Sequence, residues 1–195
     1  MRALGKGSIA EIIRVGLLIA WILLWVAAAI CGVVVISYGL NAAGILDLHD
    51  FWGPGAHFHM DVGGSRIETA PGAPTWPVII PAFLIAAVAI TGGLMIVFRL
   101  RKLFDSFCSG EPFARENATH LRAIWITMLG VEVARYMLLL LTGALLTAYG
   151  DAATAHADIK LNINLSTWAS ILILIVLAEV FREGARLKRE QELTI

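Results

Sequence analysis

Charged residues are scarce in this sequence. They make up 15% of its 195 residues, against about 25% in an ordinary soluble domain. Hydrophobic residues make up 58%, and the mean hydropathy is +0.79. So few charges cannot shield this much apolar surface from water. The composition therefore excludes an ordinary soluble domain and predicts an integral membrane protein.

Cysteines, net charge and catalytic motifs are also scarce or absent. Of the two cysteines, Cys31 lies in an apolar run and Cys108 in a basic loop, so no disulfide framework is expected. The formal net charge is zero, which gives no indication of a nucleic acid partner. Neither a nucleophile elbow nor a phosphate-binding glycine loop is present. We expect no enzymatic activity, no cofactor and no direct contact with nucleic acid.

Four stretches are long and apolar enough to cross about 30 Å of hydrocarbon as helices. The runs are 15–46, 78–98, 123–150 and 161–178, and the third contains two charged residues. Strand alternation typical of an outer-membrane barrel is missing. We predict an all-α membrane protein, residues 1–195 forming one domain of four antiparallel transmembrane helices. The predicted spans are about 12–40, 77–100, 120–149 and 161–182.

Basic residues are divided unequally between the loops. The N-terminal tail, the middle loop and the C-terminal tail hold 12 Lys and Arg residues, whereas the other two loops hold only Arg66 and Lys160. Cytoplasmic loops carry the excess of Lys and Arg. We therefore predict a bacterial inner-membrane protein with both termini, the hairpin 101–119 and the tail 183–195 in the cytoplasm. The loops 41–76 and 150–160 are predicted to face outward.

Small residues in the first two spans predict close helix packing. The small residues are Ala28 and Gly32 in the first span and Ala82, Ala86, Ala89 and Gly93 in the second. Helices in lipid associate through close backbone approach at such residues. We expect these positions to bring the first two spans together.

Two charged residues lie inside the third span. A charge near the bilayer centre costs roughly 2.5–3.5 kcal/mol. Glu132 and Arg135 are three residues apart, so they share one helix face and can neutralise each other. The pair is either a structural ion pair that sets the register of the bundle, or a gate, proton relay or ligand counter-ion.

The first outer loop contains an alternating segment. Residues 57–62 precede Gly63-Gly64, which suits a two-residue hairpin turn, and a second short segment follows. We predict a small extracytoplasmic β-hairpin. Its alternation places His57, His59 and Asp61 on one face. These residues either form a solvated polar face or bind a zinc-like ion.

The middle loop and the tail hold the most distinctive cytoplasmic features. Gly110 and Pro112 suit the end of one helix and the start of the next. The second and third spans should therefore continue past the membrane into a hairpin, with Phe104, Phe107 and Phe113 packed inside it. Anchoring to anionic lipid headgroups accounts for the basic residues, but does not require Phe113 or the apolar end of the tail.

These segments resemble the bacterial membrane family known as domain of unknown function 2975. The resemblance is carried by Gly110-Glu111-Pro112-Phe113, Glu116-Asn117, Leu121-Arg122 and the tail from Ala178 to Ile195. It implies a four-helix membrane protein commonly encoded beside a small helix-turn-helix protein. The resemblance therefore implies a regulatory role.

We expect a membrane-embedded regulator that binds a small helix-turn-helix transcription regulator at its cytoplasmic face and controls the access of that regulator to DNA. Besides the helix-turn-helix regulator, the expected partners are the bilayer and a second copy of the chain in a homo-oligomer. The alternatives are a small channel or transporter that uses Glu132 and Arg135, and an extracytoplasmic metal sensor. The expected docking residues are Phe113, Glu116, Asn117, Arg122, Phe181, Arg182, Leu193, Thr194 and Ile195.

Overall fold

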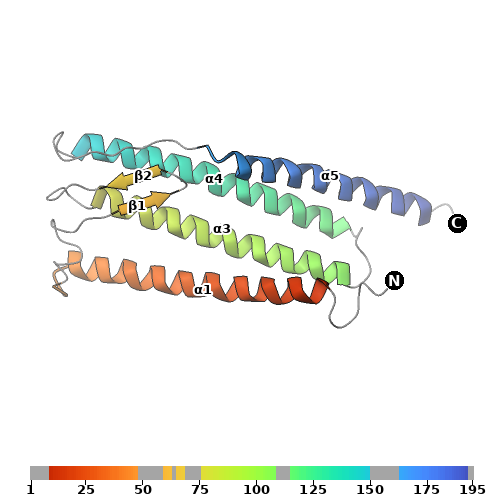
Figure 1. Ribbon diagram of the computed structural model, residues 1–195, viewed down its shortest axis with the longest axis horizontal. Coiled ribbons are helices and arrows are strands. Elements are labelled where there is room, and N and C mark those ends of the chain that lie inside the picture. Colours follow the sequence, from red (N-terminus) through yellow and green to blue (C-terminus); the bar gives the residue numbers. More distant parts are fainter. Residues whose placement is uncertain are drawn as a thin grey trace. The chain divides into compact units, whose positions relative to one another are not determined.

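The protein is helical. The computed structural model describes residues 9–47, 59–62, 65–68, 76–108, 115–149 and 163–192. Its helices are α1 (Ile9–Ala42), α3 (Trp76–Cys108), α4 (Arg115–Tyr149) and α5 (Leu165–Glu192) (Figure 1). In the part of the chain so described, these four helices are long and apolar enough to span a membrane. This confirms the predicted class, and the chain is a multi-pass membrane protein.

The helices extend past several predicted span boundaries. Helix α3 continues to Cys108 and α4 begins at Arg115, so both run beyond the apolar segments as expected. The predicted hairpin residues Gly110, Pro112 and Phe113 lie outside the described residues. Helix α5 begins at Leu165, later than the predicted start at 161. Asn164, which precedes it, belongs to the residue types favoured at a helix N-cap.

Two short strands lie between α1 and α3 in the chain. Strand β1 (His59–Val62) pairs antiparallel with β2 (Ser65–Glu68), with His59 opposite Glu68 and Val62 opposite Ser65. The turn residues and the strand side chains lie outside what the structure describes. The side of the membrane on which these strands lie, and the orientation of His59 and Asp61, stay predictions.

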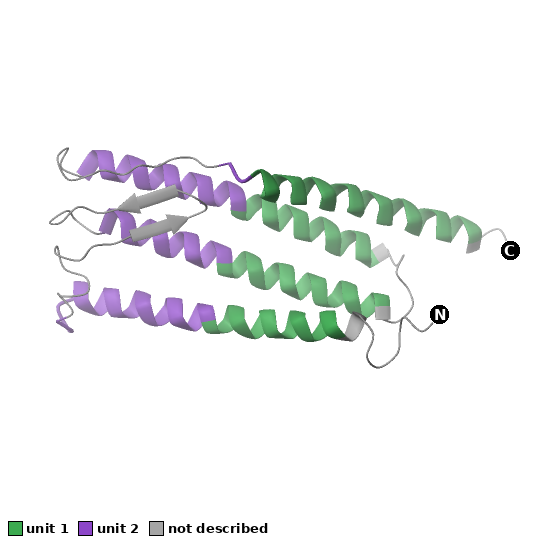
Figure 2. Ribbon diagram, in the orientation of Figure 1, with its two compact units in different colours: residues 1–26, 90–131, 165–195 green, residues 27–89, 132–164 purple. Residues whose placement is uncertain are grey.

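The chain divides into two compact units, which Figure 2 colours separately. Unit 1 comprises residues 1–26, 90–131 and 165–195. Its α3 and α4 segments are antiparallel. Side-chain contacts join Ser106 to Asn117 and Met95 to Thr127, so residue numbers fall along α3 as they rise along α4. Buried Leu103, Leu121 and Ala178 form a core shared by α3, α4 and α5.

Glycines allow close helix approach in unit 1. A Cβ atom at Gly92 of α3 would lie 2.3 Å from Val131 Cγ2 of α4, which is too close for any other residue without movement. A Cβ atom at Gly93 would lie 3.1 Å from Leu24 Cδ2 of α1. Gly93 therefore faces the first span, as predicted.

Unit 2 comprises residues 27–89 and 132–164. Its buried cluster contains Val78 and Ile85 of α3 with Leu139 and Leu146 of α4. Aromatic contacts join Trp76 to Tyr149 and Tyr38 to Phe83. The predicted close approach at Gly32 is wrong, because a Cβ atom there would meet nothing within 4 Å. The helix presents that position to open space rather than to a neighbouring backbone.

Large apolar side chains are exposed on every helix, among them Ile30, Leu84, Leu140 and Leu172. In water such a surface would be an aggregation liability, whereas in a bilayer it is the surface that faces lipid. The buried polar residues Asn117, Glu132 and Thr142 therefore contrast with an apolar exterior.

Candidate functional site

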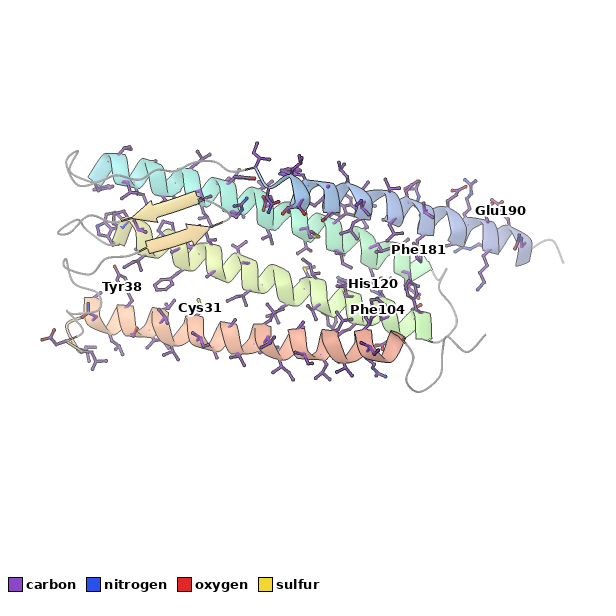
Figure 3. All side chains as sticks on the ribbon, viewed as in Figure 1. Cys31, Tyr38, Phe104, His120, Phe181 and Glu190 are labelled. Carbon is purple, nitrogen blue, oxygen red and sulfur yellow. The ribbon has the colours of Figure 1, made fainter. Side chains whose placement is uncertain are left out.

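Helices α3, α4 and α5 meet around the apolar core at one end of unit 1. Leu100, Phe107, Trp125, Leu174 and Phe181 pack against its buried members. Figure 3 shows Phe104 on α3, His120 on α4 and Phe181 on α5. The predicted docking residue Phe181 thus packs against this apolar core.

Aromatic rings join α3 to α5. Phe104 and Phe107 are in edge contact, with ring centroids 5.8 Å apart and an interplanar angle of 74°. Phe107 also stacks on Phe181 at 5.8 Å and 19°. Two of the three phenylalanines expected to pack in the hairpin therefore make ring contacts, and one of these contacts crosses to the C-terminal helix.

A buried polar contact joins α3 to α4. Asn117 is 1% exposed, and its Nδ2 donates a hydrogen bond to Ser106 Oγ at 2.9 Å. Arg99 Nη1 of α3 lies 3.4 Å from His120 Nδ1 of α4. Because Asn117 is covered, it positions the neighbouring surface and offers no direct contact to a partner. Glu116, one residue earlier, is exposed in the first turn of α4.

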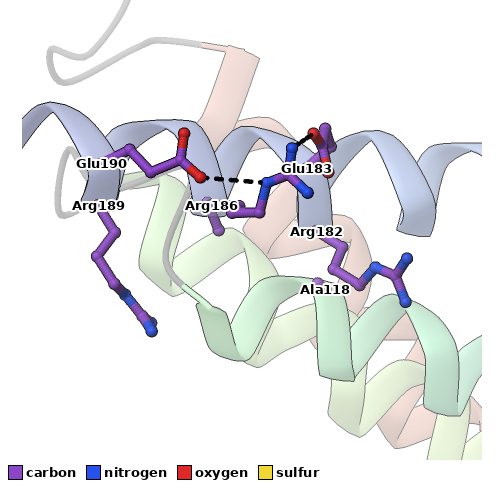
Figure 4. A pocket seen from close by; sticks show the side chains of 7 residues that line it. Ala118, Arg182, Glu183, Arg186, Arg189 and Glu190 are labelled. Carbon is purple, nitrogen blue, oxygen red and sulfur yellow. Dashed lines mark ion pairs between the residues drawn. The ribbon is translucent and has the colours of Figure 1, made fainter.

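A groove runs between α4 and α5 in unit 1 and has two adjoining hollows of about 480 and 460 Å³. Ala118 and Arg182 line both, so we name the whole feature the α4–α5 groove. The first hollow is lined by Ala118, Thr119, Arg122, Trp125, Ile175, Ala178, Glu179 and Arg182. The second is lined by Ala118, Arg182, Glu183, Ala185, Arg186, Arg189 and Glu190 (Figure 4). Small alanine side chains leave the space that longer side chains border.

Two of the four cations that line the groove are paired with carboxylates of their own helix. Arg182 pairs with Glu179, three residues earlier. Arg186 Nη2 lies 2.6 Å from Glu183 Oε1, and its Nε lies 3.5 Å from Glu190 Oε1 (Figure 4). These are ordinary i,i+3 and i,i+4 pairs on a helix surface.

Two arginines of the groove differ from these. Arg122 on α4 and Arg189 near the end of α5 are exposed, and no carboxylate among the described residues lies within ion-pair distance of either. The groove therefore presents a positive charge at each of its two hollows. A ligand with carboxylates and a slender apolar surface fits this arrangement.

The structure places the predicted docking residues in three groups. Arg122 and Arg182 line the α4–α5 groove, Asn117 and Phe181 support it, and Glu116 lies exposed on α4. Phe113, Leu193, Thr194 and Ile195 lie outside the described residues. Sequence reasoning missed Ser106, Ala118 and Arg189. The spacing of Ala178, Arg182, Ala185 and Arg189 at three or four residues is the signal that indicates one helix face.

The intramembrane pair forms in unit 2. Arg135 Nη2 lies 2.6 Å from Glu132 Oε1, and Arg135 Nε donates to Oε2 at 3.2 Å. The side chains are 12% and 9% exposed, and the guanidinium carbon lies 4.6 Å from the ring centroid of Tyr136. Both carboxylate oxygens are thus engaged by one guanidinium, a bidentate geometry that is the strongest form of this contact.

The predicted metal-binding residues are scarcely covered by the structure. His57 lies outside the described residues, as do the side chains of His59 and Asp61. In the remaining described part of the chain, no group of three His, Cys, Asp or Glu residues could hold a metal ion. The metal hypothesis for the outer loop stays untested.

Comparison with known proteins yields one family. The family described as "Protein of unknown function (DUF2975)" matches residues 67–195. No curated protein and no solved structure matches the chain. The matched range includes α3, α4 and α5, and with them the buried Asn117, the intramembrane pair and the α4–α5 groove.

Proposed function

The chain belongs to this family, and on that premise we propose that it is a bacterial inner-membrane regulator whose α4–α5 groove binds a small helix-turn-helix transcription regulator. Both termini and the groove face the cytoplasm, and the paired strands β1 and β2 face outward. Holding the regulator at the membrane controls the DNA that it can reach.

The distribution of Lys and Arg supports this orientation. Twelve Lys and Arg residues lie in or near the two chain ends and the connection between α3 and α4, whereas the other two connections hold only Arg66 and Lys160. The groove is lined by the N-terminal part of α4 and the C-terminal part of α5. In this orientation it is therefore open to the cytoplasm.

The observation that carries the proposal is the positively charged α4–α5 groove, which lies on helices that are joined by side-chain contacts. Arg122 and Arg189 supply positive charge that no described carboxylate offsets, while the Asn117–Ser106 hydrogen bond and the Phe107–Phe181 stack join the three helices below. A surface that is already ordered loses little conformational entropy when it binds a partner.

The charge of the groove indicates which face of the regulator docks. A DNA-binding domain approaches phosphates with a basic surface. The arginines of the groove repel such a surface and attract an acidic one. The regulator would therefore dock through acidic and small apolar side chains on a face other than its DNA-binding face.

The geometry of Glu132 and Arg135 supports a structural role over the channel or transporter alternative. Both oxygens of Glu132 contact the Arg135 guanidinium, so the two charges neutralise each other within one helix. A structural ion pair of this kind lowers the cost of placing charge in the membrane without a ligand.

Binding is tested with the full-length protein in detergent or nanodiscs and the helix-turn-helix regulator encoded beside its gene. Replacing Arg122 and Arg189 together by Gln should raise the dissociation constant at least fivefold, which corresponds to roughly 1 kcal/mol. Phe113→Ala and deletion of residues 193–195 should each weaken binding by a similar factor.

The matched control removes two charges elsewhere in unit 1. Replacing Arg101 and Lys102 of α3 by Gln should leave regulator binding nearly unchanged. Equal losses from both pairs would show that the effect is nonspecific charge attraction. If the wild-type protein binds no helix-turn-helix regulator, the regulatory function is wrong.

Orientation is tested with single cysteines in a background that lacks Cys31 and Cys108. An impermeant thiol reagent added to intact cells should label a cysteine at Ser65 and not one at Ser109. The reverse labelling pattern would place the groove outside the cell and remove the proposed function.

A further inference from the structure

Helices α1 and α3 of unit 1 share a surface on which cations lie over aromatic rings. The Arg101 guanidinium carbon is 5.8 Å from the ring centroid of Trp21, and Lys102 Nζ is 4.6 Å from that of Phe98. The rings contact one another, with Trp21 6.5 Å from Phe98 and 6.3 Å from Trp25. We call these five residues the cation–aromatic surface.

The charges of this surface are compensated differently from those of α5. Arg182 and Arg186 of α5 pair with carboxylates of their own helix. Among the described residues, neither Arg101 nor Lys102 has a carboxylate within ion-pair distance. Each instead lies over a ring, which attracts a cation without neutralising it.

An acidic residue of α3 partly offsets the positive charge. Asp105 lies on the same face of α3, four residues after Arg101, and its Oδ1 is 3.9 Å from Arg14 Nε of α1. Both of these side chains are exposed. Among the described side chains, these three cations and one carboxylate give a net charge of about +2.

The surface lies where the apolar part of α3 ends. The uncharged run of α3 extends to Phe98, and Arg101 and Lys102 follow within one turn. Trp25 and Phe98 are exposed. Aromatic rings at this depth contact the glycerol and upper acyl region of a bilayer, and cations one turn further reach the headgroup phosphates.

We propose that the cation–aromatic surface is a binding site for an anionic phospholipid, with Arg101 and Lys102 holding the headgroup phosphate and Trp21, Trp25 and Phe98 contacting the glycerol and acyl chains. The net positive charge selects a headgroup of net negative charge over a zwitterionic one, because Arg101 and Lys102 already lie over the rings that a choline cation would contact. This site is separate from the α4–α5 groove and does not depend on the regulator.

The proposal is tested in reconstituted membranes with spin-labelled lipids. The measured quantity is the relative association of spin-labelled phosphatidylglycerol and spin-labelled phosphatidylcholine with the wild-type protein. Wild type should prefer phosphatidylglycerol. Replacing Arg101 and Lys102 together by Gln should reduce this preference severalfold, by up to about fivefold for each charge removed.

The matched control is a second pair of adjacent cations. Replacing Lys188 and Arg189 of α5 by Gln removes the same formal charge from a helix outside the cation–aromatic surface. This control should retain most of the preference. Equal losses in the two double variants would overturn the site in favour of general charge attraction, and an unchanged preference in the Arg101 and Lys102 variant would overturn it outright.

A further variant tests the aromatic part of the site. Trp21→Leu keeps an apolar side chain but removes the ring below Arg101, and it should reduce the preference by less than the charge removal does. Circular dichroism checks that its helical content equals that of wild type. A folded Trp21→Leu protein with wild-type preference would show that the ring does not contribute to binding.

Discussion

The same Glu-x-x-Arg pattern occurs in two regions of the molecule with different surroundings. Glu132 and Arg135 lie in unit 2 with side chains 9% and 12% exposed, whereas Glu179 and Arg182 lie in unit 1 with side chains 60% and 71% exposed. Both pairs are ion pairs within one helix. The same ion pair can therefore have different energetic effects, depending on how far the surrounding side chains bury it.

The buried Glu132–Arg135 pair offsets the cost of removing two charges from water, whereas the exposed Glu179–Arg182 pair adds little to the free energy of unfolding. A charge in a low-dielectric interior is expensive unless a partner neutralises it. In water the same pair gains little Coulomb energy and orders two long side chains, so its contribution is about 0–1 kcal/mol. The comparison leads to a graded set of predictions.

The largest effect is expected from breaking the buried pair. Arg135→Leu leaves an uncompensated carboxylate and should destabilise the protein by about 3–5 kcal/mol. The double variant Glu132→Gln with Arg135→Leu should recover much of this loss, because it leaves no charge behind. Thermal unfolding in detergent and in nanodiscs measures both. A single variant as stable as wild type would show that the two residues are not energetically paired.

A smaller effect is expected at the close approach of α3 and α4. Gly92→Ala places a methyl group 2.3 Å from the Val131 side chain and should cost about 1–3 kcal/mol through overpacking. Gly130→Ala is the control, because its added methyl group meets nothing within 4 Å and removes the backbone freedom of glycine. It should be neutral or stabilising. Equal destabilisation by both changes would contradict the packing of these helices.

The buried hydrogen bond between α3 and α4 should contribute less again. Asn117→Ala removes the donor to Ser106 Oγ and should cost about 1 kcal/mol. The neighbouring exposed Glu116→Ala should change stability by less than about 0.5 kcal/mol. Since Asn117 positions the groove, its variant should also weaken regulator binding. Normal stability together with weakened binding would indicate a direct contact instead.

The smallest effect on stability is expected at the exposed pair. Arg182→Leu should change the free energy of unfolding by less than about 1 kcal/mol. The change should shrink further at high salt, because screening weakens exposed pairs. Unfolding at two salt concentrations, with Arg135→Leu measured alongside, tests the contrast. A loss at Arg182 as large as that at Arg135 would contradict the difference in burial.

Relations within one helix were predictable from the sequence. The apolar runs placed four helices, because about 20 apolar residues are needed to cross the hydrocarbon. The three-residue spacing of Glu132 and Arg135 predicted their pairing, because residues three apart share a helix face. The expected contacts of Phe104 and Phe107 also lie within one turn of one helix. Each of these inferences needs only the known periodicity of an α-helix.

Relations between helices were not predictable to the same degree. Ala-rich spans indicated close packing, yet Gly93 faces Leu24 while Gly32 faces open space. The Ser106–Asn117 hydrogen bond joins residues whose sequence context gave no sign of a shared contact. Such contacts depend on the rotation of each helix about its axis and on its register against a neighbour, and many combinations of these fit the same composition.

The sequence by itself determined a four-helix membrane chain, the positions of its charges and the local pairing of Glu132 with Arg135, since these follow from hydropathy and helix periodicity. Only the tertiary structure decided which charges remain uncompensated. Arg122 and Arg189 flank a groove because α5 packs beside α4, and Arg101 lies over Trp21 because α1 packs beside α3. The physical reason is that the surroundings of a charge are set by side chains from other helices, whose approach no single segment specifies.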